Sequence, residues 1–147
     1  MSGAAFDPDC MFCRIAHSEL PASVVYEDDA TLAFMDIRPA RPGHTLVIPR
    51  PHAPLLRDLG DDARAKLWAS VMRVYDALRA SDIPMDAVNL IVADGTAAGQ
   101  EVPHAHVHLI PRQSGDGFGF RRPPGSWLIA ERDDLDTMAA RIRSGAH

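Results

Sequence analysis

Residues 102–112 read VPHAHVHLIPR and place a histidine at every second position of the segment. The histidines alternate with apolar residues, a pattern typical of a β-strand that presents different side chains on its two faces. We therefore predict a strand over 104–111, with successive histidines about 6.6 Å apart, whose apolar face packs against a helix. The histidines are His104, His106 and His108, and the apolar residues between them are Ala105, Val107 and Leu109.

Three explanations of the histidine face remain open: the polar outer face of an edge strand, metal ligation, and catalysis on a phosphate. Two histidines on a strand can be ligands, but three in a straight row make a poor tetrahedral cage. Catalysis needs one neutral imidazole as nucleophile, and histidine suits this role because its pKa lies near neutrality. Gly95, Gly99 and Gln100 favour catalysis, since a glycine-bearing turn allows backbone N–H groups to face an anion.

Length and charge narrow the class of protein. A chain of 147 residues fits one domain whose core needs no disulfide bridges. Its net charge of −5 argues against a general nucleic-acid binder, which carries a basic surface, but leaves small phosphorylated ligands open. The sequence shows neither a signal peptide nor an apolar run of about 18 residues, so we expect a cytoplasmic protein without a membrane partner.

Hydrophobic periodicity predicts an α+β fold with a mostly antiparallel sheet. Apolar residues recur at helical spacing over 61–81, and Asp61 and Asp62 favour a helix start there. A C-terminal helix is expected over 131–144, and a short helix within 10–20. The expected strands are 23–27, 31–36, 44–49, 87–93 and 104–111.

Three segments together resemble the histidine triad (HIT) family. They are AGQEVPHAHVHLIPR at 98–112, VVYEDDATLAFMDIRPARPGHTLVIPRPH at 24–52, and SGDGFG at 114–119. The resemblance implies a HIT-like fold, with one five-stranded antiparallel sheet, two main helices, and a sheet that extends across a homodimer. It makes residues 1–147 a single HIT domain, with a flexible N-terminal tail at 1–9 and a variable C-terminal tail, including a helix, at 113–147.

The resemblance also implies hydrolysis or nucleotidyl transfer at the α-phosphate of purine nucleotide conjugates. These are phosphoramidates, aminoacyl adenylates or dinucleoside polyphosphates. His106 would attack phosphorus and form a nucleotidyl-histidine intermediate, which water then releases. His108 and His44 would hold the imidazole tautomer and the phosphate, and Gln100 would contact oxygens around the scissile bond. Arg112 either assists at the phosphate or is a solvated surface residue.

Such members need no catalytic cofactor, because positive charge at the phosphate comes from imidazole and backbone N–H groups. Asp36 would bind the ribose hydroxyls, since a carboxylate accepts two hydrogen bonds. Phe34 and Ile37 would hold the base, although ordinary core packing explains them equally well. The full set of expected substrate-binding residues is Phe34, Asp36, Ile37, Asn89, Gly99, Gln100, Val102 and His108.

Cys10 and Cys13 form a C-x-x-C pair, a spacing typical of zinc sites or redox pairs in a reducing compartment. Some bacterial HIT proteins carry a structural zinc, and the resemblance assigns its ligands to Cys10, Cys13, His52 and His104. Together they make a closed Cys2His2 set, which suits a structural zinc ion. The pair does not begin the helix of a βαβ unit, so the redox explanation is weaker, and two free thiols remain an alternative.

Two positions depart from the family pattern. Ala93 replaces an asparagine or glutamine that contacts substrate in related proteins, and Glu101 brings a carboxylate close to the expected phosphate. We therefore expect weak or unusual substrate preference. An alternative function is a nucleotide-binding sensor or scaffold with little turnover.

Overall fold

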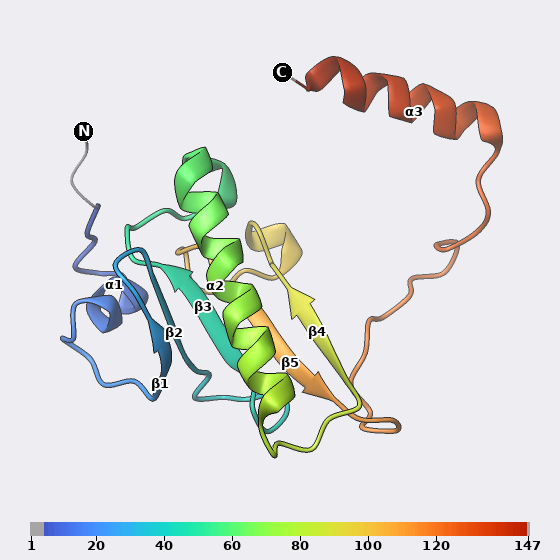
Figure 1. The fold of residues 1–147 in the computed structure, drawn as a ribbon. Coiled ribbons are helices and arrows are strands. Elements are labelled where there is room, and N and C mark those ends of the chain that lie inside the picture. The colour runs from blue at the N-terminus through green and yellow to red at the C-terminus, as the bar shows by residue number, and fades with distance from the viewer. Residues whose placement is uncertain (1–4, 147) are drawn as a thin grey trace. The chain divides into compact units, whose positions relative to one another are not determined.

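The computed structural model describes residues 5–146, within which five strands form one antiparallel sheet (Figure 1). The order across the sheet is β1-β2-β3-β5-β4, so β1 and β4 are its edges. This arrangement confirms the predicted α+β class and the antiparallel sheet. The strands are β1 Val24–Glu27, β2 Thr31–Met35, β3 Thr45–Pro49, β4 Ala87–Ile91 and β5 Val107–Arg112. The helices are α1 Met11–Ala16, α2 Asp61–Ala80 and α3 Arg132–Gly145, with 3-10 turns at Leu56–Asp58 and Thr96–Ala98.

The chain divides into two units between Asp116 and Gly117. The first unit contains the whole sheet with α1 and α2, and the second contains α3. Asp116, whose side chain is only 3% exposed, accepts two hydrogen bonds from Arg112 at 2.8 and 2.6 Å and so fixes the end of the first unit. Among residues 5–146, no helix combines the length and the apolar character that a membrane span requires.

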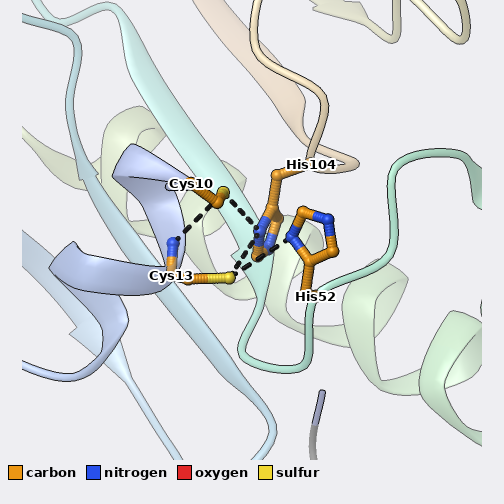
Figure 2. A group of neighbouring side chains, drawn as sticks. All are labelled: Cys10, Cys13, His52 and His104. Atoms are coloured by element: carbon orange, nitrogen blue, oxygen red, sulfur yellow. Dashed lines mark hydrogen bonds between the residues drawn. The ribbon is translucent and has the colours of Figure 1, made fainter. Parts of the chain in front are cut away.

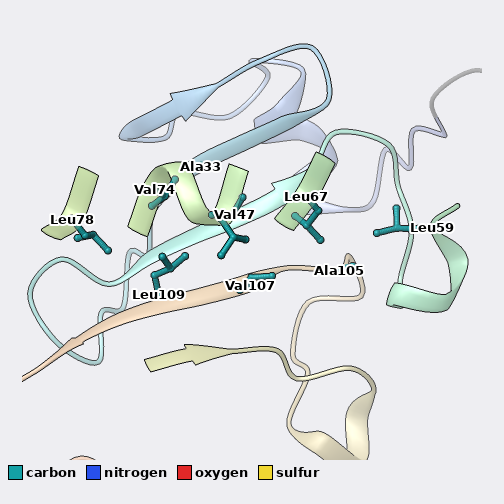
Figure 3. Close-up of a cluster of buried hydrophobic side chains, with 11 residues drawn as sticks. Ala33, Val47, Leu59, Leu67, Val74, Leu78, Ala105, Val107 and Leu109 are labelled. Carbon is teal, nitrogen blue, oxygen red and sulfur yellow. The ribbon is translucent and has the colours of Figure 1, made fainter. Parts of the chain in front are cut away.

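One face of the sheet packs against α2. In β2 and β3 every second residue points to this face, as Ala33 and Val47 do, and both are fully buried. Val107 and Leu109 of β5 also lie in this cluster, as the alternation in the sequence predicts (Figure 3). Helix α2 contributes residues at helical spacing, which are Leu67, Val71, Val74 and Leu78.

The opposite face of the sheet packs against α1. A second apolar cluster there includes Phe34, Leu46 and Ile48 from the strands and Phe12 from α1. The sheet is therefore buried on both sides, and β3 is buried along its whole length. Helix α1 and the strand residues opposite it form the side of the fold on which the site described below is built.

A polar network ties the β1–β2 hairpin to α2. The hydroxyl of Thr31 lies 2.6 Å from that of Ser70, and both side chains are buried. Asp28 accepts hydrogen bonds from the N–H groups of Ala30 and Thr31. Burial alone would raise the pKa of Asp28, but these bonds and one from Tyr26 lower it to about 2. The hairpin thus keeps an ionised carboxylate at its turn.

The structure differs from the predicted strand boundaries in two places. Strand β5 begins at Val107, so His104 and His106 precede it, and β4 ends at Ile91, before Ala93. Residues 1–4 of the predicted flexible tail lie outside the described residues. In the rest of that segment, the carbonyl of Ala5 accepts a hydrogen bond from the N–H of His52 at 2.7 Å.

The core against α2 should dominate the stability of the first unit. Leu67→Ala removes a fully buried side chain, and we expect the free energy of unfolding to fall by about 3 kcal/mol. Asp76→Ala on the exposed side of the same helix should change it by less than about 0.5 kcal/mol. Urea denaturation followed by circular dichroism measures both. Equal losses from the two variants would contradict this assignment of the core.

Candidate functional site

A cavity of about 330 Å³ opens on the side of the sheet that faces α1. Of the predicted substrate and catalytic residues, seven line it: Phe34, Asp36, Ile37, Gly99, Val102, His106 and His108. Met11, Phe12 and Ile15 of α1 line it as well, and sequence reasoning missed them. The apolar residues next to the C-x-x-C pair could have indicated a cavity wall, but only the two cysteines of this segment were considered at the level of the sequence.

The three histidines do not form a straight row. Because His104 and His106 precede β5, the pleat of the strand does not set the spacing of these two residues. The ring centroids of His106 and His108 lie 4.8 Å apart. The ring of His104 turns away from the cavity toward the two cysteines, with its Nδ1 3.4 Å from the Cys10 Sγ. The motif therefore supplies two different sites.

The hydrogen bonds of His106 define its tautomer. Its Nδ1 lies 2.7 Å from the backbone carbonyl oxygen of His104, and a carbonyl can only accept, so Nδ1 carries the proton. In the neutral form of the ring, Nε2 then keeps a lone pair. The ring is buried, 6% exposed, at the cavity wall. His106 thus has the tautomer that a nucleophile needs.

A relay of hydrogen bonds sets the neighbouring tautomers in the same way. The N–H of Ala40 donates to the Nδ1 of His44 at 3.0 Å, so His44 is protonated on Nε2. That Nε2 donates to the Nδ1 of His108 at 2.9 Å, which leaves the Nε2–H of His108 as a donor. Burial lowers the pKa of both histidines, that of His108 to about 4, so both are neutral at pH 7.

Gly43 places His44 at the start of this relay. It has a φ of +92°, which favours glycine, and a Cβ there would lie 3.0 Å from Pro111 and 3.1 Å from Ile83. The turn it makes ends in a hydrogen bond from the N–H of His44 to the carbonyl of Arg41. A larger residue at this position would displace His44 from His108.

Asp36 stands at the edge of the relay. Its Oδ2 lies 3.6 Å from the Nε2 of His44, and its Oδ1 accepts a hydrogen bond from the N–H of Arg38. Asp36, His44 and His108 are close enough to hold a metal ion. However, the His44 Nε2 already donates a hydrogen, and a metal there would force the proton onto Nδ1, against the N–H of Ala40. The relay therefore favours proton and anion chemistry over metal ligation.

Gln100 does not point to the cavity. Its Oε1 accepts a hydrogen bond from the N–H of Gly95 at 2.7 Å, and its Nε2 donates to the carbonyl oxygens of Pro54 and Val102. The N–H of Gly99 also bonds within the loop. The amide and N–H groups that were expected to face an anion hold the loop in shape instead. Gln100 fixes the path of the segment that leads to the histidines.

Two further polar residues are engaged away from the cavity. The Oδ1 of Asn89 accepts a hydrogen bond from Arg112 at 2.6 Å, and Asn89 is not among the residues that line the cavity. Arg112 also donates two hydrogen bonds to Asp116 at the end of the first unit, so its guanidinium is engaged there.

Glu101 lies at the cavity and forms an exposed ion pair with Arg38 at 3.8 Å, which directs its carboxylate toward that guanidinium.

The four predicted metal ligands come together (Figure 2). Their ligand atoms all lie within 4.8 Å of one another. Cys13 Sγ lies 3.3 Å from the Nδ1 of His52 and 3.6 Å from the Nδ1 of His104. The Nε2 of His104 lies 2.7 Å from the carbonyl oxygen of Pro49 and donates to it, so Nδ1 presents a lone pair to the group.

The chemistry of these donors fits a zinc ion. Two sulfurs and two imidazole nitrogens in a closed, mostly buried group are a typical structural zinc set. Burial raises the pKa of the Cys13 thiol to about 11, so a bound cation would be needed to hold it as a thiolate. The carbonyl of Pro49 orients His104 in the way that a second partner orients zinc-bound histidines.

Comparison with known proteins identifies relatives over most of the chain. A HIT domain family model matches residues 17–115. An uncharacterized HIT-like protein of Borreliella burgdorferi is 45% identical over 135 residues, 91% of this chain and 96% of that protein. The adenosine 5'-monophosphoramidase HNT1 of Saccharomyces cerevisiae is 36% identical and covers 75% of this chain and 66% of its own. The adenylylsulfatase HINT3 of Arabidopsis thaliana is 38% identical, covering 74% of this chain and 54% of its own.

Solved structures agree with these matches. A HIT family protein from Bacillus anthracis superposes with a TM-score of 0.85 at 33% identity, covering 95% of this chain and 99% of its own. A zinc-bound histidine triad family protein from Mycobacterium smegmatis superposes with a TM-score of 0.72 at 37% identity, covering 94% and 98%.

The neutral histidines should make stability depend on pH. The pKa of His108 is about 4 in the folded chain and about 6.5 when unfolded, so the unfolded chain binds more protons between these values. The free energy of unfolding should therefore be fully present above about pH 6.5 and fall as the pH drops toward 4. Between pH 7 and 4.5, the free energy of unfolding should fall by about 2 kcal/mol less in His108→Asn than in the unmodified protein. Urea titrations in the presence of a chelator measure it.

His17→Asn is the matched control, because His17 lies outside the relay and bonds to the carbonyl of Cys13. It should leave the dependence on pH as in the unmodified protein. A dependence on pH that His108→Asn does not reduce would contradict the neutral relay.

Proposed function

The chain belongs to the HIT family, and we propose that it is a hydrolase that cleaves purine nucleotide conjugates at the α-phosphate through a nucleotidyl-histidine intermediate on His106. The observation that carries this proposal is the tautomer of His106. The carbonyl of His104 holds the proton on Nδ1, and the lone pair of Nε2 is left on a buried ring at the cavity wall. An imidazole that is neutral and fixed in this tautomer needs no general base before it attacks.

In the first step, Nε2 of His106 attacks the α-phosphorus, the N–P bond forms, and the bond from phosphorus to the leaving group breaks. The attacking imidazole becomes cationic, and the carbonyl of His104 accepts the hydrogen bond from its Nδ1–H throughout. In the second step, water attacks the phosphorus, the N–P bond breaks, and the nucleoside monophosphate leaves. The electron pair of the N–P bond returns to Nε2 of His106, which restores the neutral imidazole, and one proton of the water passes to the solvent. We assign the Nε2–H of His108 as a hydrogen-bond donor to a phosphoryl oxygen in both steps and to the leaving-group atom in the first. His44 acts through His108 and is a positioning residue.

The same cavity supports recognition of the nucleoside. Phe12 and Phe34 contact each other edge to face at 5.4 Å, and Ile37 at the rim is 86% exposed, which leaves an apolar surface for a flat base. Asp36 lies between this surface and the histidines and is our candidate for the ribose hydroxyls. The names of the plant and yeast relatives, an adenylylsulfatase and an adenosine 5'-monophosphoramidase, support an adenosine conjugate as the substrate class.

We further propose a structural zinc ion at Cys10, Cys13, His52 and His104. Bound there, zinc would crosslink the segment before α1 to the residues that lead into β5. The zinc-bound relative from Mycobacterium smegmatis and the donor set itself support this assignment. We also propose a homodimer that extends the sheet, for which the edge strand β4 offers the exposed Leu90.

His106→Gln should lower kcat/KM for adenosine phosphoramidate by at least about 1,000-fold, since it removes the nucleophile. Release of AMP, followed by chromatography, measures the rate. Quenched wild-type protein should carry an adenylyl group, and the variant should not. His17→Gln should keep full activity. Activity of His106→Gln within tenfold of wild type would contradict the mechanism, and tight AMP binding without wild-type turnover would favour a sensor.

Purified protein should contain about one zinc ion per chain. Cys13→Ser should lower the zinc content at least tenfold after dialysis, because it removes a ligand. Asp36→Asn is the control, since it alters the other group of possible ligands. Elemental analysis measures both. Zinc retained in Cys13→Ser and lost in Asp36→Asn would place the metal in the histidine relay.

A further inference from the structure

Phe12 joins the zinc-type site to the cavity. It lies between Cys10 and Cys13 in sequence, is 5% exposed, and lines the cavity. The centroid of its ring lies 5.2 Å from that of His106, with 88° between the ring planes, and 5.9 Å from that of His104, with 70° between the planes. One side chain thus contacts both the proposed nucleophile and a proposed metal ligand.

Helix α1, which carries Phe12, does not hold its position alone. It spans six residues, and a helix of this length is unstable without tertiary contacts. Cys10 caps it by accepting a hydrogen bond from the N–H of Cys13, so the two cysteines bound the turn on which Phe12 stands. Fixing both sulfurs in one metal site fixes this turn against His52 and His104 (Figure 2).

A second contact runs through the backbone. The ring of His104 faces the cysteines, and its own carbonyl oxygen accepts the hydrogen bond that sets the tautomer of His106. The Nε2 of His104 is tied to Pro49 at the end of β3, which leaves little freedom for the residue to shift by itself. The metal site is therefore connected to the cavity in two ways, through the side chain of Phe12 and through the hydrogen bond between the His104 backbone and His106.

We propose that metal occupancy at Cys10, Cys13, His52 and His104 controls nucleotide affinity through Phe12, which is a positioning residue for the His106 ring. This inference rests on the proposed function of the cavity. Without the metal, the turn that carries Phe12 loosens, the ring leaves His106, and the apolar wall for the base loses its shape. Coupling between two sites is reciprocal, so nucleotide must strengthen metal binding by the same factor by which metal strengthens nucleotide binding.

The experiment is a thermodynamic cycle on the full chain with AMP and zinc as probes. The Kd of AMP is measured by calorimetry on zinc-loaded and chelator-stripped protein, and the Kd of zinc by chelator competition with and without AMP. We expect zinc to tighten AMP binding about tenfold, within the range usual for coupled sites, and AMP to tighten zinc binding equally. Circular dichroism confirms that stripped protein keeps its helix content.

Phe12→Leu tests the route of the coupling. It should still bind about one zinc per chain. The effect of zinc on the AMP Kd should fall below about threefold. Ile37→Ala is the matched control, because Ile37 lines the same cavity from outside the metal segment. It should weaken AMP binding equally with and without zinc and leave the tenfold coupling intact. Equal coupling in wild type and Phe12→Leu would overturn the proposal.

A nucleotide-free measurement separates this proposal from the proposed function. In protein labelled with ¹⁵N-histidine, the ring signals of His106 should report a single Nδ1–H tautomer with zinc bound and a mixture without it or in Phe12→Leu. Identical His106 spectra with and without zinc would overturn the coupling. A zinc-dependent spectrum in a protein that binds no AMP would support the effect of the metal on the His106 ring and would reject the nucleotide function.

Discussion

The hydrogen bond from the Nδ1–H of His106 to the carbonyl of His104 is the interaction on which the site depends. It is local, two residues apart, and it can form because the chain has not yet entered β5 at these positions. In a regular strand, the His104 carbonyl would point toward a neighbouring strand and could not reach the ring. The departure from regular structure therefore sets the tautomer of His106, the proposed nucleophile, and the strand that follows holds the segment in place.

The sheet provides the rigid frame behind this bond. Its two faces are filled by different clusters, one against α2 and one against α1, because side chains alternate along β2, β3 and β5. The pairing of His108 with Leu46 on the neighbouring strand fixes the position of His108, and the turn at Gly43 fixes the position of His44. The relay thus joins two neighbouring strands, so the register of these strands determines the distance between its histidines.

Most of the fold could be predicted from the sequence, because it follows from local patterns. Alternation located the strands, helical spacing located α2, and the burial of Val107 and Leu109 agrees with the face assigned to them. The start of β5 could not be predicted, because the alternation continues through His104 and His106 although the ladder does not. The first residue of β5 is determined by hydrogen-bonded pairing with strands that are distant in sequence, and a local pattern does not contain this information.

The candidate site was predictable in its residue types and less so in their contacts. The four sulfur and nitrogen donors lie together, as the resemblance to the HIT family implied. Gln100 was expected to contact the substrate, but its side-chain N–H groups donate to the carbonyl oxygens of Pro54 and Val102.

The buried carboxylate of Asp116 lies at the end of the first unit, where it accepts two hydrogen bonds from the guanidinium of Arg112. A different C-terminal sequence can consequently be joined just beyond Asp116 without breaking these hydrogen bonds.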